Sequence, residues 1–193
     1  MLYPHKSTPL YVPIDPLLEK RWSPTAFSAE PIEPEKIASL FEAMRWAPSC
    51  FNEQPWRVVY ATQQNQASFQ QLSSLLNEGN NWAKNAYMLA LVGVYPTFAR
   101  NGKVNAYAEY DTGAGAENFF LQAVSMDLVA HEMAGFDAEK ANVLFQNRFP
   151  DAHVLSMIVV GYPGNREDLP PDLQQREGAE RTRKPVAEVA VEL

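Results

Sequence analysis

This chain of 193 residues contains one cysteine, Cys50, and no long apolar run. A single cysteine excludes an intramolecular disulfide framework and is typical of a protein from a reducing compartment. No segment approaches the length of a transmembrane helix, and prolines interrupt the first 16 residues, where a signal peptide would need an apolar core. We therefore expect a cytoplasmic protein without a membrane partner.

Several motifs that mark common enzyme classes are missing. Neither GxGxxG nor GxxxxGK[ST] occurs, which argues against a Rossmann or P-loop nucleotide site. No HxxxH or CxxC spacing and no carboxylate cluster indicates a metal, so we expect none. The net charge of −7 argues against nucleic acid as a partner, because that partner favours a basic face.

The length and the periodicity predict one α+β domain over residues 17–193, preceded by an extended arm over residues 1–16. The pattern predicts a helix that begins at Pro34 and stops before Pro48, because proline lacks the helical N–H donor. Further helices are expected over 65–77, 111–126 and 137–145, and strands over 56–61, 86–95, 128–133 and 154–160. The 111–126 helix is apolar around most of its circumference, which predicts burial.

Residues 44–56, MRWAPSCFNEQPW, combine polar and aromatic side chains in one loop. Ser49, Asn52 and Gln54 provide hydrogen-bonding groups, and Phe51 and Trp56 provide stacking area. This combination suits a planar ligand with polar edges. An ordered surface turn that uses Ser and Asn in their usual turn roles is the alternative interpretation.

Five segments resemble the nitroreductase family of FMN enzymes, in the same order. Residues 48–56, PSCFNEQPW, are similar to the family's Pro-Ser-x-x-Asn-x-Gln-Pro-Trp segment, and RWSPTAF (21–27) resembles its Arg-x-Ser-x-Arg/Lys-x-Phe opening. The other matches are DTGAGAEN (111–118), AHEMAGFD (130–137) with GYP (161–163), and RTRKP (181–185).

The resemblance implies a three-layer sandwich, in which helices flank a mixed, mainly antiparallel sheet, built as an intertwined homodimer. It also implies an FMN oxidoreductase that takes a hydride from NADH or NADPH by a ping-pong cycle. The expected second substrate is a small electron-poor molecule such as a nitroaromatic, a quinone or an enone. Because flavin N5 does the chemistry, no catalytic side chain is expected.

The resemblance further assigns residues to the cofactor. Arginine suits phosphate because its planar fork bonds two oxygens at once, and the expected phosphate ligands are Arg21, Ser23, Arg181 and Arg183. Thr25 departs from the family, which usually has a basic residue there, near the flavin N1–O2 edge. Lys84 is a candidate to compensate for that charge.

The remaining assignments concern residues expected near the flavin ring. Asn80 or Asn81 is expected to contact the flavin, and the backbone of Ala134 and Gly135 to face N5. Ser49, Cys50 and Asn52 are expected to reach the flavin from the other subunit. The full expected cofactor-binding set also contains Trp22, Pro48, Asp111 and Met133.

Two alternatives remain. A flavin-binding sensor or flavin-consuming protein with little reductase turnover is one, because Thr25 brings no charge. A cysteine hydrolase using Cys50 and His131 is the poorer one, because nothing in the sequence near Cys50 supplies a base or a nucleophile elbow.

Overall fold

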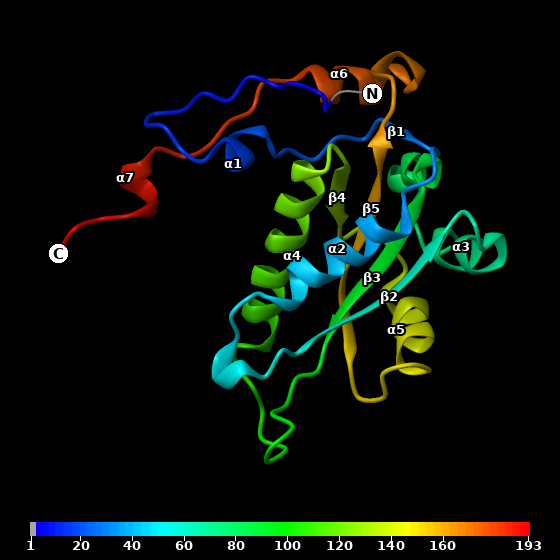
Figure 1. Cartoon of the computed structure of the whole chain (residues 1–193), viewed down its shortest axis with the longest axis vertical. Helices are drawn as coiled ribbons and strands as arrows, with labels where there is room; N and C mark the ends of the chain where they lie inside the picture. Colours follow the sequence, from blue (N-terminus) through cyan, green and yellow to red (C-terminus); the bar gives the residue numbers. More distant parts are fainter. Residues whose placement is uncertain (1–2) are drawn as a thin grey trace.

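The computed structural model describes residues 3–193. Its centre is an antiparallel five-stranded sheet in the order β1-β5-β3-β2, in which β4 also pairs with β5 (Figure 1). The strands are β1 (Phe27–Ser28), β2 (Trp56–Thr62), β3 (Met88–Val94), β4 (Val129–Met133) and β5 (His153–Pro163). All seven residues of β3 are buried, because its two sheet faces are both covered.

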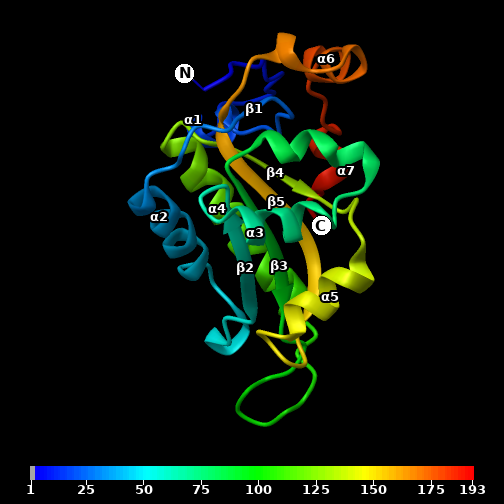
Figure 2. The same cartoon turned by 90° about the vertical axis from the view of Figure 1, so that its right-hand side faces the viewer.

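Helices cover both faces of the sheet, which confirms the predicted α+β sandwich (Figure 2). The core on one face includes Leu40 and Met44 of α2 (Pro34–Arg45) and Phe119 of α4 (Ala108–Ser125). The core on the other face includes Phe69 of α3 (Gln66–Ser73) and Phe145 of α5 (Ala138–Gln146).

The central helix α4 differs from its prediction in two ways. It begins at Ala108, three residues before the expected 111, and its apolar circumference is buried on one side only. On the buried side, a Cβ added to Gly115 would lie 3.2 Å from Met44 Cγ, so the small residue allows close packing against α2. On the other side Tyr110 is 79 % exposed and a Cβ on Gly113 would meet no atom within 4 Å.

Other differences arise from tertiary contacts. The helix expected over 65–77 ends at Ser73, and residues 78–85 form a 3-10 segment, η2 (Glu78–Asn85). Strand β1 exists through its pairing with the end of β5, which the local sequence does not reveal. The polar region after residue 164 also forms η3 (Arg166–Asp168) and helices α6 (Pro171–Gly178) and α7 (Val186–Val189).

The N-terminal arm and the segment that follows α6 run alongside each other (Figure 1). The arm packs on its own chain: Lys6 Nζ donates to the Glu177 carbonyl at 2.8 Å, and Trp22 Nε1 donates to the Pro4 carbonyl at 3.0 Å. A short helix α1 (Pro16–Lys20) follows the arm. Beyond α6 the chain leaves the body as an extended tail that carries α7 (Figure 1). No helix within residues 3–193 is long and apolar enough to cross a bilayer.

Candidate functional site

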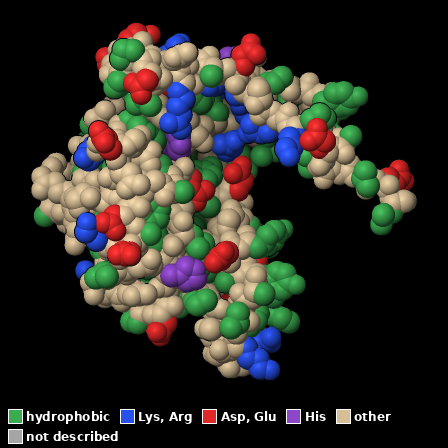
Figure 3. Space-filling view, turned by 180° about the vertical axis from the view of Figure 1, so that it is seen from behind, with side chains coloured by type: hydrophobic (Ala, Val, Ile, Leu, Met, Phe, Trp, Pro, Cys, Tyr) green, Lys and Arg blue, Asp and Glu red, His purple; other side chains and the backbone are tan. Residues whose placement is uncertain are grey.

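Three arginines from opposite ends of the chain line one cavity. Arg21, Arg181 and Arg183 border a space of about 220 Å³ that also contacts Glu117 of α4. Burial lowers the pKa of the Arg181 guanidinium, and the charges of Arg21 and Arg183 lower it further. Figure 3 shows Lys and Arg side chains gathered where the terminal segments overhang a hollow in the surface. Three arginines close together in a protein of net negative charge suit the binding of a phosphate group, because each guanidinium can donate to phosphate oxygens.

The three arginines are not equivalent. Arg181 donates to the carbonyls of Glu19 and Arg21, at 2.6 and 2.9 Å, and to Thr8 Oγ1 at 2.5 Å. It therefore caps the C-terminal end of α1 and ties the arm to the tail. Arg183 donates only to the neighbouring Thr182 carbonyl within residues 3–193, at 2.7 Å. Its guanidinium keeps free donors for an anion.

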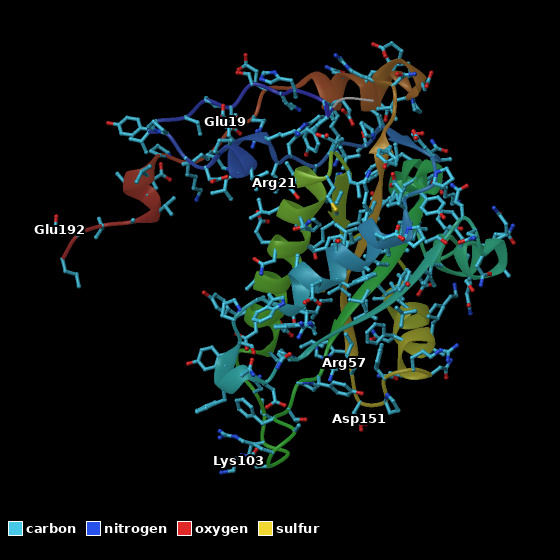
Figure 4. All side chains as sticks on the ribbon, in the orientation of Figure 1. Glu19, Arg21, Arg57, Lys103, Asp151 and Glu192 are labelled. Carbon is cyan, nitrogen blue, oxygen red and sulfur yellow. The ribbon has the colours of Figure 1, made fainter. Side chains whose placement is uncertain are left out.

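Arg21 has one carboxylate neighbour. Its Nε lies 3.6 Å from Glu117 Oε1, and its side chain is 21 % exposed. In Figure 4, Arg21 lies where α1 meets one end of α4, at the opposite end of the molecule from Lys103. Ser23, two residues further on, is exposed. The N-terminal arm packs on Trp22, and Lys6 Nζ lies 4.4 Å from the centroid of the Trp22 ring.

Thr25 is buried, and a carboxylate of α6 holds it. The Thr25 Oγ1 donates to Glu177 Oε1 at 2.8 Å, and the backbone N–H groups of Thr25 and Ala26 donate to the same oxygen. Glu177 thus fixes the loop that leads from Arg21 into β1. Nothing in the sequence marks this role, because residue 177 lies in a polar segment far from residue 25.

His131 lies behind the same loop. Its Nδ1 is 2.8 Å from the Pro24 carbonyl, and since a carbonyl only accepts, Nδ1 carries the proton. Its ring tilts against Trp82, with centroids 4.8 Å apart. Burial lowers the pKa of His131, so the imidazole is neutral at pH 7. His131 therefore supports the loop that contains Pro24 and Thr25.

The predicted turn at Ala134 and Gly135 follows the end of β4. Asn80 Nδ2 donates to the Gly135 carbonyl at 2.9 Å, so Asn80 is the asparagine that the structure brings to this turn. Asn81 is exposed. The N–H of Gly135 has no hydrogen-bond acceptor within the described chain. It remains available to a ligand.

Two other expected residues, Met133 and Lys84, differ in exposure. Met133 is 4 % exposed and belongs to the hydrophobic core. Lys84 is exposed, and its carbonyl is 3.5 Å from Gln63 Nε2 in the loop before α3. Within residues 3–193, no hydrogen bond joins Lys84 to Thr25.

The loop of residues 48–54 contains the short 3-10 helix η1 (Cys50–Asn52). Phe51 and Asn52 have left-handed backbones, with φ of 54° and 57°. Asp111, 5 % exposed on α4, accepts from the Cys50 N–H at 2.9 Å, and Ser49 Oγ accepts from the Gln54 N–H at 3.0 Å. Asp111 therefore positions this loop, while Pro48 is exposed.

Within residues 3–193, no hydrogen bond joins this loop to Arg21, Arg181 or Arg183. Asp111 holds the loop near the start of α4, whereas Lys20 of α1 pairs with Asp127, 2.7 Å away, just beyond its end. Arg21 reaches Glu117, which lies six residues after Asp111, about 9 Å along the helix axis at 1.5 Å per residue.

The structure is that of an α+β protein with an arginine-lined cavity between its terminal segments and α4. The model of the nitroreductase family matches residues 18–162, so the chain belongs to that family. A solved structure described as an oxidoreductase containing FMN is 33 % identical, with a TM-score of 0.88, over 97 % of this chain and 94 % of its own.

Two other relatives agree with this assignment. A Polynucleobacter asymbioticus protein, named as a candidate NADH dehydrogenase/NAD(P)H nitroreductase, is 26 % identical over 162 residues, covering 73 % of this chain and 80 % of its own. A nitroreductase family protein from Streptococcus pneumoniae is 19 % identical with a TM-score of 0.71, over 92 % of this chain and 98 % of its own. The latter likeness concerns the fold.

Proposed function

We propose that this protein is a homodimeric, FMN-dependent oxidoreductase that uses NADH or NADPH to reduce small electron-poor molecules. Family membership and the FMN-containing relative support the cofactor class. The observation that carries the proposal is the convergence of Arg21, Arg181 and Arg183 on one cavity. Nitroaromatics, quinones and enones are the proposed acceptors, in a cytoplasmic ping-pong cycle.

The residues present fit FMN. Arg21 and Arg183 would hold the phosphate with Ser23, and Arg181 would keep that pocket in shape through its bonds to α1. The free N–H of Gly135 would face the ring, with Asn80 fixing the turn from behind. When bound, FMN supplies hydride chemistry at its N5 atom.

The protein's own part is binding, orientation and exclusion of water. His131 is neutral and donates to the Pro24 carbonyl, so it holds the loop without moving a proton. Ser49, Cys50 and Asn52 would complete the site from the second subunit, because Asp111 presents their loop at the far end of α4. A dimer would thus bind two flavins at its interface.

The test is spectroscopic. The purified protein, titrated with FMN, is expected to bind it and to show a flavin absorbance band that NADH or NADPH bleaches rapidly without oxygen. Initial rates with a quinone acceptor should give the parallel lines of ping-pong kinetics. A protein that binds no FMN contradicts the proposal.

A second function is favoured by one observation, the uncharged Thr25 tied to Glu177. Without a positive charge beside it, a flavin is harder to reduce. The chain would then be a flavin-binding sensor or a flavin-consuming protein. Bound FMN that the nicotinamides bleach slowly or not at all would identify this case.

A further inference from the structure

Residues 96–105, between β3 and α4, form a hairpin that projects from the body of the molecule, where Lys103 is labelled in Figure 4. A β-bridge between Thr97 and Val104 joins its two arms, and the Asn105 N–H donates to the Pro96 carbonyl at 2.8 Å. These backbone bonds give the projecting segment a defined shape.

The hairpin is docked on the loop of residues 48–54. Glu53 Oε1 accepts from the Ala99 N–H at 2.7 Å, and the rings of Phe51 and Phe98 meet edge to face, with centroids 5.9 Å apart. Phe51 is 72 % exposed although its backbone is left-handed, with φ of 54°. This conformation is uncommon for a bulky residue, and such strain is found most often at functional sites.

The aromatic pair holds the guanidinium of Arg100. Arg100 Cζ lies 4.2 Å from the centroid of the Phe51 ring and 5.3 Å from that of Phe98, both within the range of a cation–π contact. Its side chain makes no hydrogen bond or ion pair with any residue from 3 to 193, so its five N–H donors are unused. In Figure 3, Lys and Arg side chains lie beside hydrophobic ones at the end of the molecule opposite the terminal segments. A guanidinium that is held in place with free donors suits an anion.

We propose that Arg100 is a specificity-determining residue that binds an anionic group on the substrate at the flavin of the second subunit. This inference rests on the proposed function, which brings Ser49, Cys50 and Asn52 to that flavin. Phe51 lies between these residues in the chain, so Arg100, stacked on Phe51, lies beside the same site. The anion is either a carboxylate on a planar acceptor or the adenosine phosphate that NADPH has and NADH lacks, a group that arginine recognises in other nucleotide sites.

The experiment compares Arg100→Gln with Lys103→Gln in the full chain loaded with FMN. The Lys103 side chain lies on the same hairpin and makes no hydrogen bond or ion pair within the described residues, so its variant removes the same charge without changing the stack on Phe51. Two substrate pairs differ by one anionic group: para-nitrobenzoate against para-nitrobenzamide, and NADPH against NADH. For the more anionic member of one pair, Arg100→Gln is expected to lose about tenfold in kcat/KM, through a higher KM. The other member should keep its wild-type value.

The pair that responds identifies the source of the anion. A loss confined to para-nitrobenzoate places the anion on the acceptor, and a loss confined to NADPH places it on the donor. Phe98→Leu keeps the charge but removes part of the stack, so it should lose part of the same preference.

Three results would overturn the inference and leave the proposed function standing, because reduction of para-nitrobenzamide by NADH reports that function separately. The first is an unchanged preference within both pairs. The second is an equal loss in Arg100→Gln and Lys103→Gln, which would mean that the overall charge of the hairpin attracts the anion. The third is an Arg100 variant that sediments as a monomer or loses FMN, which would make the cluster a contact between subunits. A wild-type protein that reduces neither acceptor overturns the proposed function and the inference with it.

Discussion

The Asp111 carboxylate accepts a hydrogen bond from the backbone N–H of Cys50, with 2.9 Å between Oδ2 and N. This bond joins the central helix to a loop 61 residues earlier in the chain. Asp111 is the fourth residue of α4, where the helix dipole favours a negative charge. The loop that it holds includes the left-handed residues Phe51 and Asn52, a conformation that costs free energy unless the surroundings fix it.

We predict that Asp111→Ala lowers the free energy of unfolding by about 1–3 kcal/mol, because the Cys50 N–H loses its acceptor. Asp111→Asn keeps an acceptor oxygen and should cost less. Urea denaturation of the flavin-free protein measures both. Glu109→Ala, at an exposed residue two positions earlier, is the control. Equal stability of the Asp111 and Glu109 alanine variants would show that the bond contributes nothing.

Arg183→Ala should weaken FMN binding roughly ten- to a hundredfold, because a charge-assisted hydrogen bond contributes about 1.5–3 kcal/mol. Riboflavin has the same ring without the phosphate, so it should bind the variant and the wild type with similar affinity. Calorimetric titration of both ligands gives the comparison. Equal losses for the two ligands would mean that Arg183 shapes the pocket and does not contact the phosphate.

Arg181→Ala should behave differently from Arg183→Ala. The Arg181 guanidinium bonds Thr8 and the carbonyls of Glu19 and Arg21, so its loss frees the arm and α1. We expect a lower melting temperature without ligand, together with weaker binding of both FMN and riboflavin. Thermal denaturation and the same titrations measure these effects. An Arg181 variant of wild-type stability that loses affinity for FMN alone would reverse the roles of the two arginines.

The position of Asn80 leaves no room for a side chain at Gly135. A Cβ on residue 135 would lie 2.6 Å from Asn80 Nδ2, so Gly135→Val has to displace that amide. We predict that Gly135→Val slows flavin reduction far more than His131→Asn, in stopped-flow experiments with NADPH. The double variant Asn80→Gly/Gly135→Ala should recover part of what Gly135→Ala alone loses. A larger effect of His131→Asn would place the critical group on His131.

The sequence predicts the main helices and strands well, because each has its own apolar periodicity. Helix α2 begins at Pro34 as expected, and Asp137 caps α5 by accepting from the Lys140 N–H at 3.1 Å. The two-residue strand β1 could not be predicted, since its only support is the pairing with Tyr162 and Pro163. Helix α6 was missed because its sequence is almost wholly polar.

The residues of the candidate site also fall into two groups, those that motifs predict and those that only three-dimensional contacts reveal. Arg21 and Arg183 were predicted from motifs, and the structure brings them to one cavity. The choice between Asn80 and Asn81 required coordinates, because only the hydrogen bond to Gly135 separates them. Glu177 lies outside every motif. Its role arises from contacts between segments about 150 residues apart, which local patterns do not encode.

The final prediction concerns His131 and acid stability. Burial lowers the pKa of His131 in the folded protein, whereas in the unfolded chain it is near 6.5. The unfolded state therefore binds the proton more readily, so stability is complete above that pH and falls as the pH drops through it toward the folded pKa. One such proton costs at most about 1.4 kcal/mol per pH unit. His131→Asn keeps a donor for the Pro24 carbonyl but does not titrate. Urea unfolding of the flavin-free proteins between about pH 5 and 8 should thus give a flatter profile of stability against pH for the variant than for wild type. Parallel profiles would show that His131 binds its proton equally in both states, and that burial does not control its charge.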